Sequence, residues 1–345
     1  MPQTSHFRIP VKDDNLIVIT DGGVDFGFGH LTRCLAIATE FESVGFNIRF
    51  IVNGDSSIHD ILAGKSFTVF NWNNEQQKLA DQLIEGSIVL IDSMTISDSL
   101  ILKLEKLNII IVFIDDERRR NILNRGFVID WTVLSDKQDH FIYKKENVTY
   151  LLGSSYTPLR KEFYLSKKNN IKQNLETILI TFGGADPMSL TPEVLKALVD
   201  NFPEINKNVV IGSGFKNIEN IKKYKDKNTD LIFNVNAAKM ARLMQNCDIA
   251  IASGGQTLYE LAQVGTPAIA ILLVENAKHD TVGWDKVGSV KNIGWYYDNK
   301  LLENLIATIE TLKNKSLRES MQQKAQKYIS PNGAKVLVDT ILDQL

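Results

Sequence analysis

Short apolar runs, each followed by a longer stretch with helical spacing, limit most strongly what this chain can fold into. Such runs suit strands buried on both faces, and these occur in parallel sheets with helices packed against each side. Strands that alternate with helices along the chain predict the α/β class. The runs lie at 16–20, 48–52, 87–92 and 109–115 in the first half, and at 177–182, 208–212, 230–235, 248–252 and 268–273 in the second.

The length is sufficient for two domains. The chain has 345 residues, of which 44% are hydrophobic, so each half can bury a core of its own. The polar, lysine-rich stretch 154–174 separates the two groups of apolar runs, and we expect the domain boundary there. This gives an N-terminal domain at 1–165 and a C-terminal domain at 166–345, whose tail from about 301 consists of consecutive helices.

Charge and composition narrow the class of partner. The net charge is −2 and the pI is about 6.3, which argues against nucleic acid or an anionic membrane as the main partner. Cys34 and Cys247 stand far apart without metal-site spacing, as expected of buried thiols in a reducing compartment. The N-terminus lacks the apolar core of a signal peptide, and no run of about 18 apolar residues occurs. We therefore expect a cytoplasmic protein without a membrane span, and make no prediction of its oligomeric state.

Paired glycines follow three of the strand predictions, as TDGG at 20–23, TFGG at 181–184 and ASGG at 252–255. A strand that leads through a glycine turn into a helix leaves backbone N–H groups free at the positive end of the helix, where they can bind phosphate. Many α/β connections contain glycine for geometric reasons alone. Three such turns at the carboxyl ends of strands nevertheless favour a phosphorylated ligand in a cleft between the domains.

The stretch FGFGHLTR at 26–33 places one of five histidines at the start of a predicted helix. The third glycine of GxGxxG is missing there, and no GxxxxGK[ST] occurs, so neither a dinucleotide-binding oxidoreductase nor a P-loop ATPase is favoured. Histidine as a residue type has a pKa of about 6.5, which suits proton transfer, so His30 is a candidate acid or base, although a capping role explains a lone histidine equally well. Arg33 could bind an anion, but a solvated arginine is the more common case.

The stretch SGGQTLYELAQVGTPAI at 253–269 contains a second candidate site. Ser253, Gly254 and Gly255 precede a helix with an apolar face, and Glu260 lies within that helix. A helical glutamate is usually solvated surface, but one near a phosphate-binding helix start can also hydrogen-bond ribose hydroxyls.

Four stretches together resemble the pseudaminic-acid pathway hydrolase family; in order, they are GFGHLTRCLAIA, LLGSSYTPLRKEF, ITFGGADPMSLT and ASGGQTLYELAQVGTPAIAI. Members of that family hydrolyse UDP-2,4-diacetamido-2,4,6-trideoxy-β-L-altropyranose and release UDP, in nonulosonic-acid or surface-polysaccharide biosynthesis. The resemblance covers nearly the whole chain. It implies a GT-B-like fold with two Rossmann-like domains facing each other across a cleft, an N-terminal sugar and catalytic domain, a C-terminal nucleotide domain, and no cofactor or metal.

The resemblance also implies roles for individual residues. His30 would be catalytic and would place or activate water at the sugar C1, while Glu260 would hold the ribose. The glycine turns and Gln256 would line the diphosphate, whose growing charge helix N-termini can absorb. Glu275 and Asn276 would lie near the sugar. The full predicted substrate-binding set is Gly27, Gly29, Arg33, Asp92, Gly183, Gly184, Ser253, Gly254, Gly255, Gln256, Glu260, Glu275 and Asn276.

Two motifs depart from the pattern of the family. Where the family has Asp-x-Tyr at a strand end, this chain has DSM at 92–94. Where the family has Glu-Asn-Gln, this chain has ENA at 275–277. Met94 therefore replaces a tyrosine hydroxyl that helps to order substrate and water. Three functions stay open: a UDP-sugar hydrolase, a GT-B glycosyltransferase with a UDP-sugar donor, and an inactive nucleotide-sugar binding protein. The acidic pair at 115–116 fits a polar strand end better than a metal site.

Overall fold

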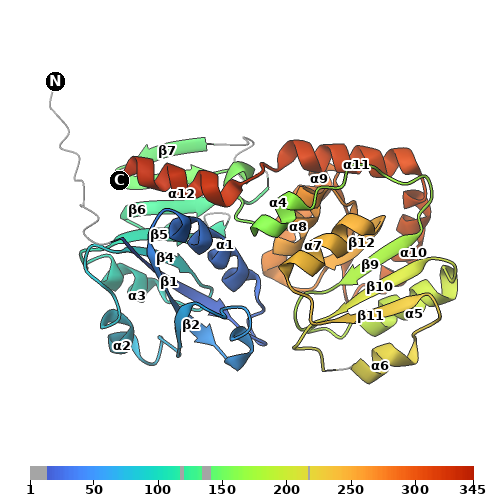
Figure 1. The fold of residues 1–345 in the computed structure, drawn as a ribbon, viewed down its shortest axis with the longest axis horizontal. Helices are drawn as coiled ribbons and strands as arrows, with labels where there is room; N and C mark the ends of the chain where they lie inside the picture. Colours follow the sequence, from blue (N-terminus) through green and yellow to red (C-terminus); the bar gives the residue numbers. More distant parts are fainter. Residues whose placement is uncertain (1–13, 117–119, 134–140, 217) are drawn as a thin grey trace. The chain divides into compact units, whose positions relative to one another are not determined.

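The computed structural model of this protein describes residues 14–116, 120–133, 141–216 and 218–345. These residues divide into two compact units, each built on its own sheet (Figure 1). Of the described residues, the first unit holds 14–116, 120–131, 141–158 and 333–345, and the second unit holds 132–133, 159–216 and 218–332.

The described part of the first unit contains an eight-stranded sheet in the order β3-β2-β1-β4-β5-β6-β8-β7. Its neighbouring strands pair in parallel except for β7, which runs antiparallel to β8. The central strands β4 and β5 are buried along their whole length, as a sheet covered on both faces requires. The strands are β1 (Asn15–Gly22), β2 (Asn47–Gly54), β3 (Ser66–Val69), β4 (Ile88–Asp92), β5 (Ile110–Ile114), β6 (Arg125–Asp130), β7 (Phe141–Lys145) and β8 (Asn147–Leu152).

Helix α1 follows β1 and leads back along the sheet to β2. It buries Leu31, Cys34 and Phe41 on one side, and the chain leaves it through Gly45, whose φ is 102°. The helical segments with described bounds in the first unit are α1 (Gly29–Ser43), η1 (Ser56–Ile58), α2 (Gln76–Ala80), α3 (Asp98–Leu104), η3 (Ser154–Tyr156) and α12 (Gly333–Gln344).

The C-terminal helix α12 belongs to the first unit, although it follows the second unit in the sequence. It buries an apolar face and packs against α1 and η3. At its start, a Cβ on Gly333 would come within 2.2 Å of the carbonyl oxygen of Thr157, so the two backbones touch. The structural division therefore differs from the one predicted at 165/166. Periodicity predicted a helical tail correctly, but it cannot show which sheet the last helix covers.

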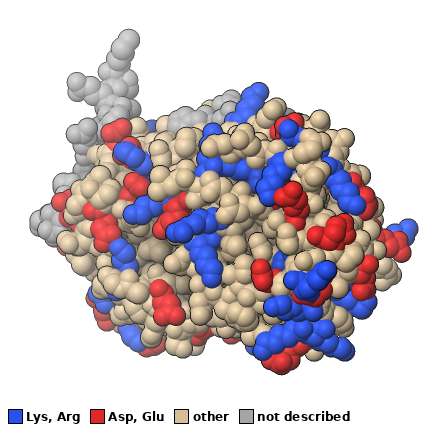
Figure 2. Space-filling model, turned by 45° about the vertical axis from the view of Figure 1, so that its right-hand side comes forward, with Lys and Arg blue, Asp and Glu red and all other residues tan. Residues whose placement is uncertain are grey.

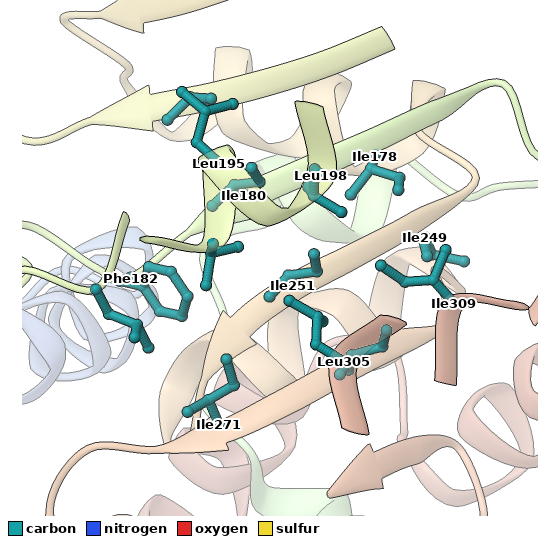
Figure 3. Packing of buried hydrophobic residues seen from close by; sticks show 14 of the residues in the cluster. Ile178, Ile180, Phe182, Leu195, Leu198, Ile249, Ile251, Ile271, Leu305 and Ile309 are labelled. Atoms are coloured by element: carbon teal, nitrogen blue, oxygen red, sulfur yellow. The ribbon is translucent and has the colours of Figure 1, made fainter. Parts of the chain in front are cut away.

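The described part of the second unit contains a six-stranded parallel sheet in the order β11-β10-β9-β12-β13-β14. Its core gathers apolar side chains from β9, β12 and β13 together with those of α5 and α10 (Figure 3). The strands are β9 (Thr177–Thr181), β10 (Asn206–Ile211), β11 (Thr229–Phe233), β12 (Ile249–Ser253), β13 (Ala268–Leu272) and β14 (Val290–Trp295). The helical segments are α4 (Lys161–Leu165), α5 (Thr191–Asn201), α6 (Ile218–Lys223), α7 (Ala237–Asn246), α8 (Gln256–Val264), η4 (Glu275–Ala277), α9 (Lys278–Val287), α10 (Leu301–Leu312) and α11 (Lys315–Tyr328).

Every apolar run that predicted a strand forms one, and the predicted α/β class is confirmed. The strands that the sequence did not reveal are β3, β6, β7, β8 and β14. Several of these are edge strands or contain charged residues and glycine, as in FIYKK of β7 and VKNIGW of β14. A half-exposed strand needs no continuous apolar run, so the pattern used for buried strands does not detect it.

Lysine and arginine side chains are interspersed with aspartate and glutamate over the face shown in Figure 2. Within the described residues, none of the helices has both the length and the apolar character that a bilayer span requires.

Candidate functional site

Polar side chains of the first unit gather where β1, β4 and β5 end. These strands are parallel neighbours, so their carboxyl ends lie at one edge of the sheet, where α/β proteins usually bind ligands. A pocket of about 500 Å³ opens there. The residues of its wall that matter below are His30, Arg33, Asp92, Met94, Asp116 and Arg120.

His30 stands in the first turn of α1, and Asp92 is the last residue of β4. Their side chains meet, with His30 Nδ1 2.8 Å from Asp92 Oδ1. The turn before the helix passes through Gly27, whose φ is 74°, a conformation that favours glycine. No heavy atom lies within 4 Å of where a Cβ would stand on Gly27 or Gly29, so the approach to this turn is open. The structure brings five predicted site residues together here: Gly27, Gly29, His30, Arg33 and Asp92.

Arg33 is not solvated, contrary to the more common expectation for a helical arginine. Its Nε and Nη2 donate to the two oxygens of Asp92 at 2.6 Å each, and its Nη1 donates to Asp116 at 3.0 Å. The guanidinium carbon also lies 5.0 Å from the ring centre of Trp131. Burial by itself would lower the pKa of Arg33, but Asp116 and Asp92 outweigh it and raise that pKa well above its usual value. Arg33 therefore holds Asp92 in place.

The protonation of His30 follows from its neighbours. Nδ1 lies 2.8 Å from Asp92 and 3.1 Å from Arg33 Nη2, and it can donate to the first or accept from the second. The contact with the carboxylate is shorter and charge-assisted, so we assign the proton to Nδ1. Within the described residues Nε2 makes no hydrogen bond. Its lone pair is thus available as a general base at the pocket.

The carboxyl of Asp92 is poised to remain charged. Burial would raise its pKa, but Arg33 and then His30 more than offset burial and hold the pKa well below the usual range. Cys34 lies behind it, with Sγ 3.5 Å from Asp92 Oδ2. Burial raises the pKa of the Cys34 thiol, and the Asp92 charge raises it further, so this cysteine stays a neutral packing residue.

The first site contains residues that the sequence analysis did not select. Asp116 pairs with Arg33, and Arg120 lines the same pocket. The acidic residues near the ends of the apolar runs gave a usable signal, since the aspartates of ITD, LID and FID lie at or next to the ends of β1, β4 and β5. The strand order was needed to show that these ends are neighbours.

In the second unit, α8 begins directly after the ASGG turn, as predicted. Gly255 has a φ of 91°, and no heavy atom lies within 4 Å of its Cβ position. No side chain caps the helix, and its first turn has no acidic residue, so its N–H groups suit an anion. Gly254 has another reason to be glycine, because a Cβ there would lie 2.3 Å from Thr281 Oγ1. Its role is close packing against α9.

The TFGG turn does not lead directly into a helix, so the prediction of a free helix start there is wrong. Helix α5 begins at Thr191, and the Asp186 carboxylate already accepts from the N–H groups of Leu190 and Thr191 at 3.0 and 2.9 Å. Gly183 has a φ of 76° and open space around it, whereas the carbonyl of Gly184 accepts from the Gly214 N–H at 2.9 Å.

The TDGG turn differs from the prediction in the same way, since its glycines precede the start of α1 by several residues. The Gly23 N–H donates to the Gly27 carbonyl at 3.1 Å. The TDGG turn thus folds back onto the FGFGH turn instead of opening a helix.

Glu260 is buried, with 8% of its surface exposed, so the solvated-surface interpretation is wrong. Its Oε1 lies 3.1 Å from Nη2 of Arg160, a residue of the quoted LLGSSYTPLRKEF stretch that the sequence analysis did not select. Burial raises the pKa of Glu260, and Arg160 opposes that rise. Glu260 Oε2 makes no hydrogen bond within the described residues, and this leaves an acceptor for a hydroxyl group.

Glu275 and Asn276 are exposed in η4, directly after β13. Glu275 pairs with Lys278 at 2.9 Å. Because a Cβ on Gly254 would lie 2.8 Å from Ala277, η4 packs against the ASGG turn. The structure thus groups Ser253, Gly254, Gly255 and Gln256 with Glu275 and Asn276 at one edge of the second sheet. Among the residues that the structure describes, no three His, Cys, Asp or Glu side chains form a group that could hold a metal ion.

Comparison with known proteins adds to this geometry. Residues 177–340 match the Glycosyltransferase family 28 C-terminal domain. The chain is 30% identical over 266 residues to the uncharacterized protein MJ1062 of Methanocaldococcus jannaschii. The matched residues are 74% of this chain and 55% of that protein. It is 26% identical over 302 residues to the pseudaminic acid cytidylyltransferase and UDP-2,4-diacetamido-2,4,6-trideoxy-beta-L-altropyranose hydrolase of Helicobacter pylori. The matched residues are 85% of this chain and 51% of that protein. The chain spans about half the length of these two relatives.

A third relative, the UDP-2,4-diacetamido-2,4,6-trideoxy-beta-L-altropyranose hydrolase of Campylobacter jejuni, is 23% identical over 275 residues, which are 77% of this chain and 93% of that protein. Among solved structures, Acinetobacter baumannii MurG has a TM-score of 0.64 at 17% identity, over 95% of this chain and 99% of that one. The UDP-GlcNAc 2-epimerase from Neisseria meningitidis bound to UDP-GlcNAc has a TM-score of 0.63 at 13% identity, over 95% of this chain and 100% of that one. The predicted GT-B-like fold, with Rossmann-like units and a helical tail, is confirmed, as is the predicted resemblance to the hydrolase family.

Proposed function

We propose that this protein is an enzyme that hydrolyses a UDP-sugar at the anomeric carbon and releases UDP. The proposed sugar is a diacetamido-trideoxy hexose, in nonulosonic-acid or surface-polysaccharide biosynthesis. The observation that carries the proposal is the 2.8 Å contact between His30 Nδ1 and the Asp92 carboxylate, which leaves Nε2 as a base at a pocket of about 500 Å³. The Helicobacter pylori and Campylobacter jejuni relatives, which are named for this hydrolysis, support it.

In this proposal the first unit performs the chemistry. His30 Nε2 accepts a proton from water as the water oxygen bonds to the sugar C1. The bond from C1 to the diphosphate oxygen breaks, and its electron pair leaves with UDP. Asp92 stabilises the imidazolium that forms, in the manner of a triad carboxylate, and Arg33 fixes Asp92 through two hydrogen bonds of 2.6 Å. The proton on His30 then passes to solvent, and the products are free sugar and UDP.

The second unit would bind the nucleotide. The start of α8 at Gly255 and Gln256 would face the diphosphate and absorb the negative charge that grows as it leaves. The carboxylate of Glu260, held on one side by Arg160, would accept a ribose hydroxyl with its other oxygen. Gly183 leaves open space at the end of the adjacent strand β9, and Glu275 and Asn276 would contact the sugar.

The test is incubation of the purified protein with a panel of UDP-sugars in ¹⁸O-labelled water, with no acceptor present. We expect release of UDP and ¹⁸O in the sugar, because attack at C1 places the water oxygen there. The His30→Asn variant serves as the control for a contaminating hydrolase. Label in the UDP, or equal rates in the two proteins, would contradict the proposed chemistry. Tight binding of UDP-sugars without turnover would identify a binding protein instead.

A glycosyltransferase is the second candidate, and the match of residues 177–340 to a glycosyltransferase C-terminal domain favours it. An acceptor hydroxyl would then take the place of water at C1, and Met94 would border the space that it enters. UDP release that requires an added acceptor, and that yields no free sugar, would select this function over hydrolysis.

A further inference from the structure

The segment 93–98 forms one wall of the pocket in the first unit and follows directly after Asp92. It connects β4 to α3 and has no regular secondary structure over most of its length. The Met94 side chain projects from it with 56% of its surface exposed. Since the segment is joined directly to Asp92 and contains Met94, its conformation bears on the position of both.

The donor groups of this wall point to Asp21, near the end of β1. Asp21 is buried, with 1% of its surface exposed. Its Oδ2 accepts from Ser93 Oγ at 2.8 Å and from the N–H groups of Met94 and Thr95 at 2.7 and 3.1 Å. Its Oδ1 accepts from Thr95 Oγ1 at 2.7 Å, and from Asn53 Nδ2 at 3.3 Å. The donors that meet Asp21 are therefore neutral, and most come from the wall.

Two carbonyl groups of the wall and the Asp98 carboxylate face Arg120. Its Nη2 donates to the Ile96 carbonyl at 2.7 Å and to the carboxylate of Asp98, while its Nη1 lies 3.5 Å from the Ser93 carbonyl. The Arg120 guanidinium lies 5.5 Å from the ring centre of Phe113, which supports it from β5. The Asp21 carboxylate thus accepts from two N–H and two O–H groups of one short segment, and the Arg120 guanidinium faces two of its C=O groups.

We propose that Asp21 and Arg120 are positioning residues that clamp segment 93–98 as a fixed wall of the sugar pocket. This inference rests on the proposed function, in which that pocket holds the sugar. With its backbone groups bonded to the clamp, the wall is formed before the ligand arrives and holds Met94 toward the sugar. This gives the TDGG motif a role, since its aspartate, and not its glycines, acts on the site.

The clamp is tested with Asp21→Ala and Arg120→Met, and with the milder Thr95→Val, which removes one donor to Asp21. The matched control is Glu105→Ala. Glu105 is another buried carboxylate of the first unit, and it accepts the N–H groups of Asn124 and Arg125 near the start of β6, away from the carboxyl ends of the strands. Three quantities are measured for each protein: hydrogen–deuterium exchange of residues 93–98, kcat/KM for the UDP-sugar, and the inhibition constant of UDP.

We expect exchange of the 94–96 amides to rise about tenfold or more in the clamp variants, because those N–H groups lose their acceptors or their fixed geometry. We expect kcat/KM to fall about tenfold or more, since small displacements at a reacting centre are costly. The UDP constant should stay within about twofold of wild type, because the groups proposed to bind the nucleotide lie in the other unit. Glu105→Ala should match wild type in all three measurements.

Folded clamp variants with wild-type exchange and wild-type kcat/KM would overturn the inference. So would a loss of UDP binding that parallels the loss of kcat/KM, because Asp21 would then support the fold in general. If Asp21→Ala does not fold, Thr95→Val and Arg120→Met decide the matter. The exchange measurement needs no turnover, so absence of hydrolysis by the wild type would refute the proposed function and leave the clamp testable.

Discussion

Replacing Arg33 with methionine removes a cation that bonds both Asp92 and Asp116 at the pocket. Methionine keeps an unbranched apolar stem that can lie near Trp131, so the change deletes charge and hydrogen bonds with little loss of packing. Asp92 then loses two donors at 2.6 Å, and Asp116 loses one at 3.0 Å. The side chain of Asp92 is 2% exposed, so water cannot replace these donors.

The expected cost follows from that burial. Breaking a buried ion pair by removing one partner typically costs about 3 to 5 kcal/mol, because an uncompensated charge is left inside. Arg33 donates three charge-assisted hydrogen bonds, and its partner Asp92 is almost fully buried. The cost of Arg33→Met at neutral pH should therefore lie within this range. The free energy of unfolding should therefore fall by about 3 to 5 kcal/mol. In the control Arg49→Met, the lost guanidinium bonds the Gln82 amide and no other side chain of the described residues, so the variant should lose less than about 1 kcal/mol.

The loss should also depend on pH, and its sign can be worked out. Burial would raise the pKa of Asp92, but Arg33 and His30 hold it below its usual range. A carboxyl with a lowered pKa stabilises the folded state above its unfolded pKa of about 4, and that contribution is lost as pH falls through the folded pKa. Without Arg33, burial should raise the pKa of Asp92 above its unfolded value, so the variant loses stability as pH rises. The difference between the two proteins should be largest near pH 7 and should shrink toward about pH 4.5.

Urea unfolding followed by circular dichroism at about pH 7 and about pH 4.5 measures both effects. Arg33→Met and Arg49→Met should be compared with wild type in the same buffers. If Arg33→Met lowers the free energy of unfolding by less than about 1 kcal/mol, the guanidinium does not stabilise the Asp92 carboxylate as described. A large loss of equal size at both pH values would refute the ionic explanation and assign the effect to packing.

Three further outcomes are expected. His30→Asn should lower turnover about a hundredfold or more and leave UDP binding by calorimetry nearly unchanged; normal turnover would remove His30 from the chemistry. Glu260→Ala should weaken UDP binding by about 1.5 to 3 kcal/mol in the same assay, while the exposed Glu275→Ala should leave UDP binding nearly unchanged; equal affinities would return Glu260 to a purely structural pair with Arg160. Met94→Tyr should lower the native activity if the pocket is shaped for a different sugar or an acceptor, and a clear gain of hydrolysis on the diacetamido altrose substrate would contradict that shape.

The central strands could be predicted from the sequence because burial on both faces leaves a direct record in apolar runs such as LIVIT and IVLID. The start of α8 could be predicted as well, since strand, glycines and helix follow each other without interruption there. The same pattern failed at TFGG, because Asp186 turns the chain and caps α5 itself. A cap that lies several residues before its helix is not visible in the spacing of glycines.

The partners of Arg33 could not be predicted, because they come from distant parts of the chain. Asp92 ends β4 and Asp116 follows β5. The two meet α1 only because β4 lies next to β1, and β5 next to β4, in one sheet. From sequence spacing alone, a solvated Arg33 was the more common expectation. The strand order instead places Arg33 against two carboxylates. The same holds for Glu260, whose partner Arg160 lies about a hundred positions earlier in the chain.

The charges of the two candidate sites bear on which reaction is possible. In the proposed chemistry, positive charge develops at the sugar near the carboxylate of Asp92, and negative charge develops on the diphosphate near the uncapped start of α8. Both groups are fixed before the ligand binds, so they would stabilise the transition state more than the ground state. A hydrolase and a transferase need these charges equally, and the charged residues therefore cannot distinguish them. The difference lies in the nucleophile that reaches C1. The N–H groups of Met94 and Thr95 are already bonded to Asp21, and the Ile96 carbonyl is bonded to Arg120. The space beside the fixed Met94 side chain should then decide whether water or an acceptor hydroxyl reaches His30.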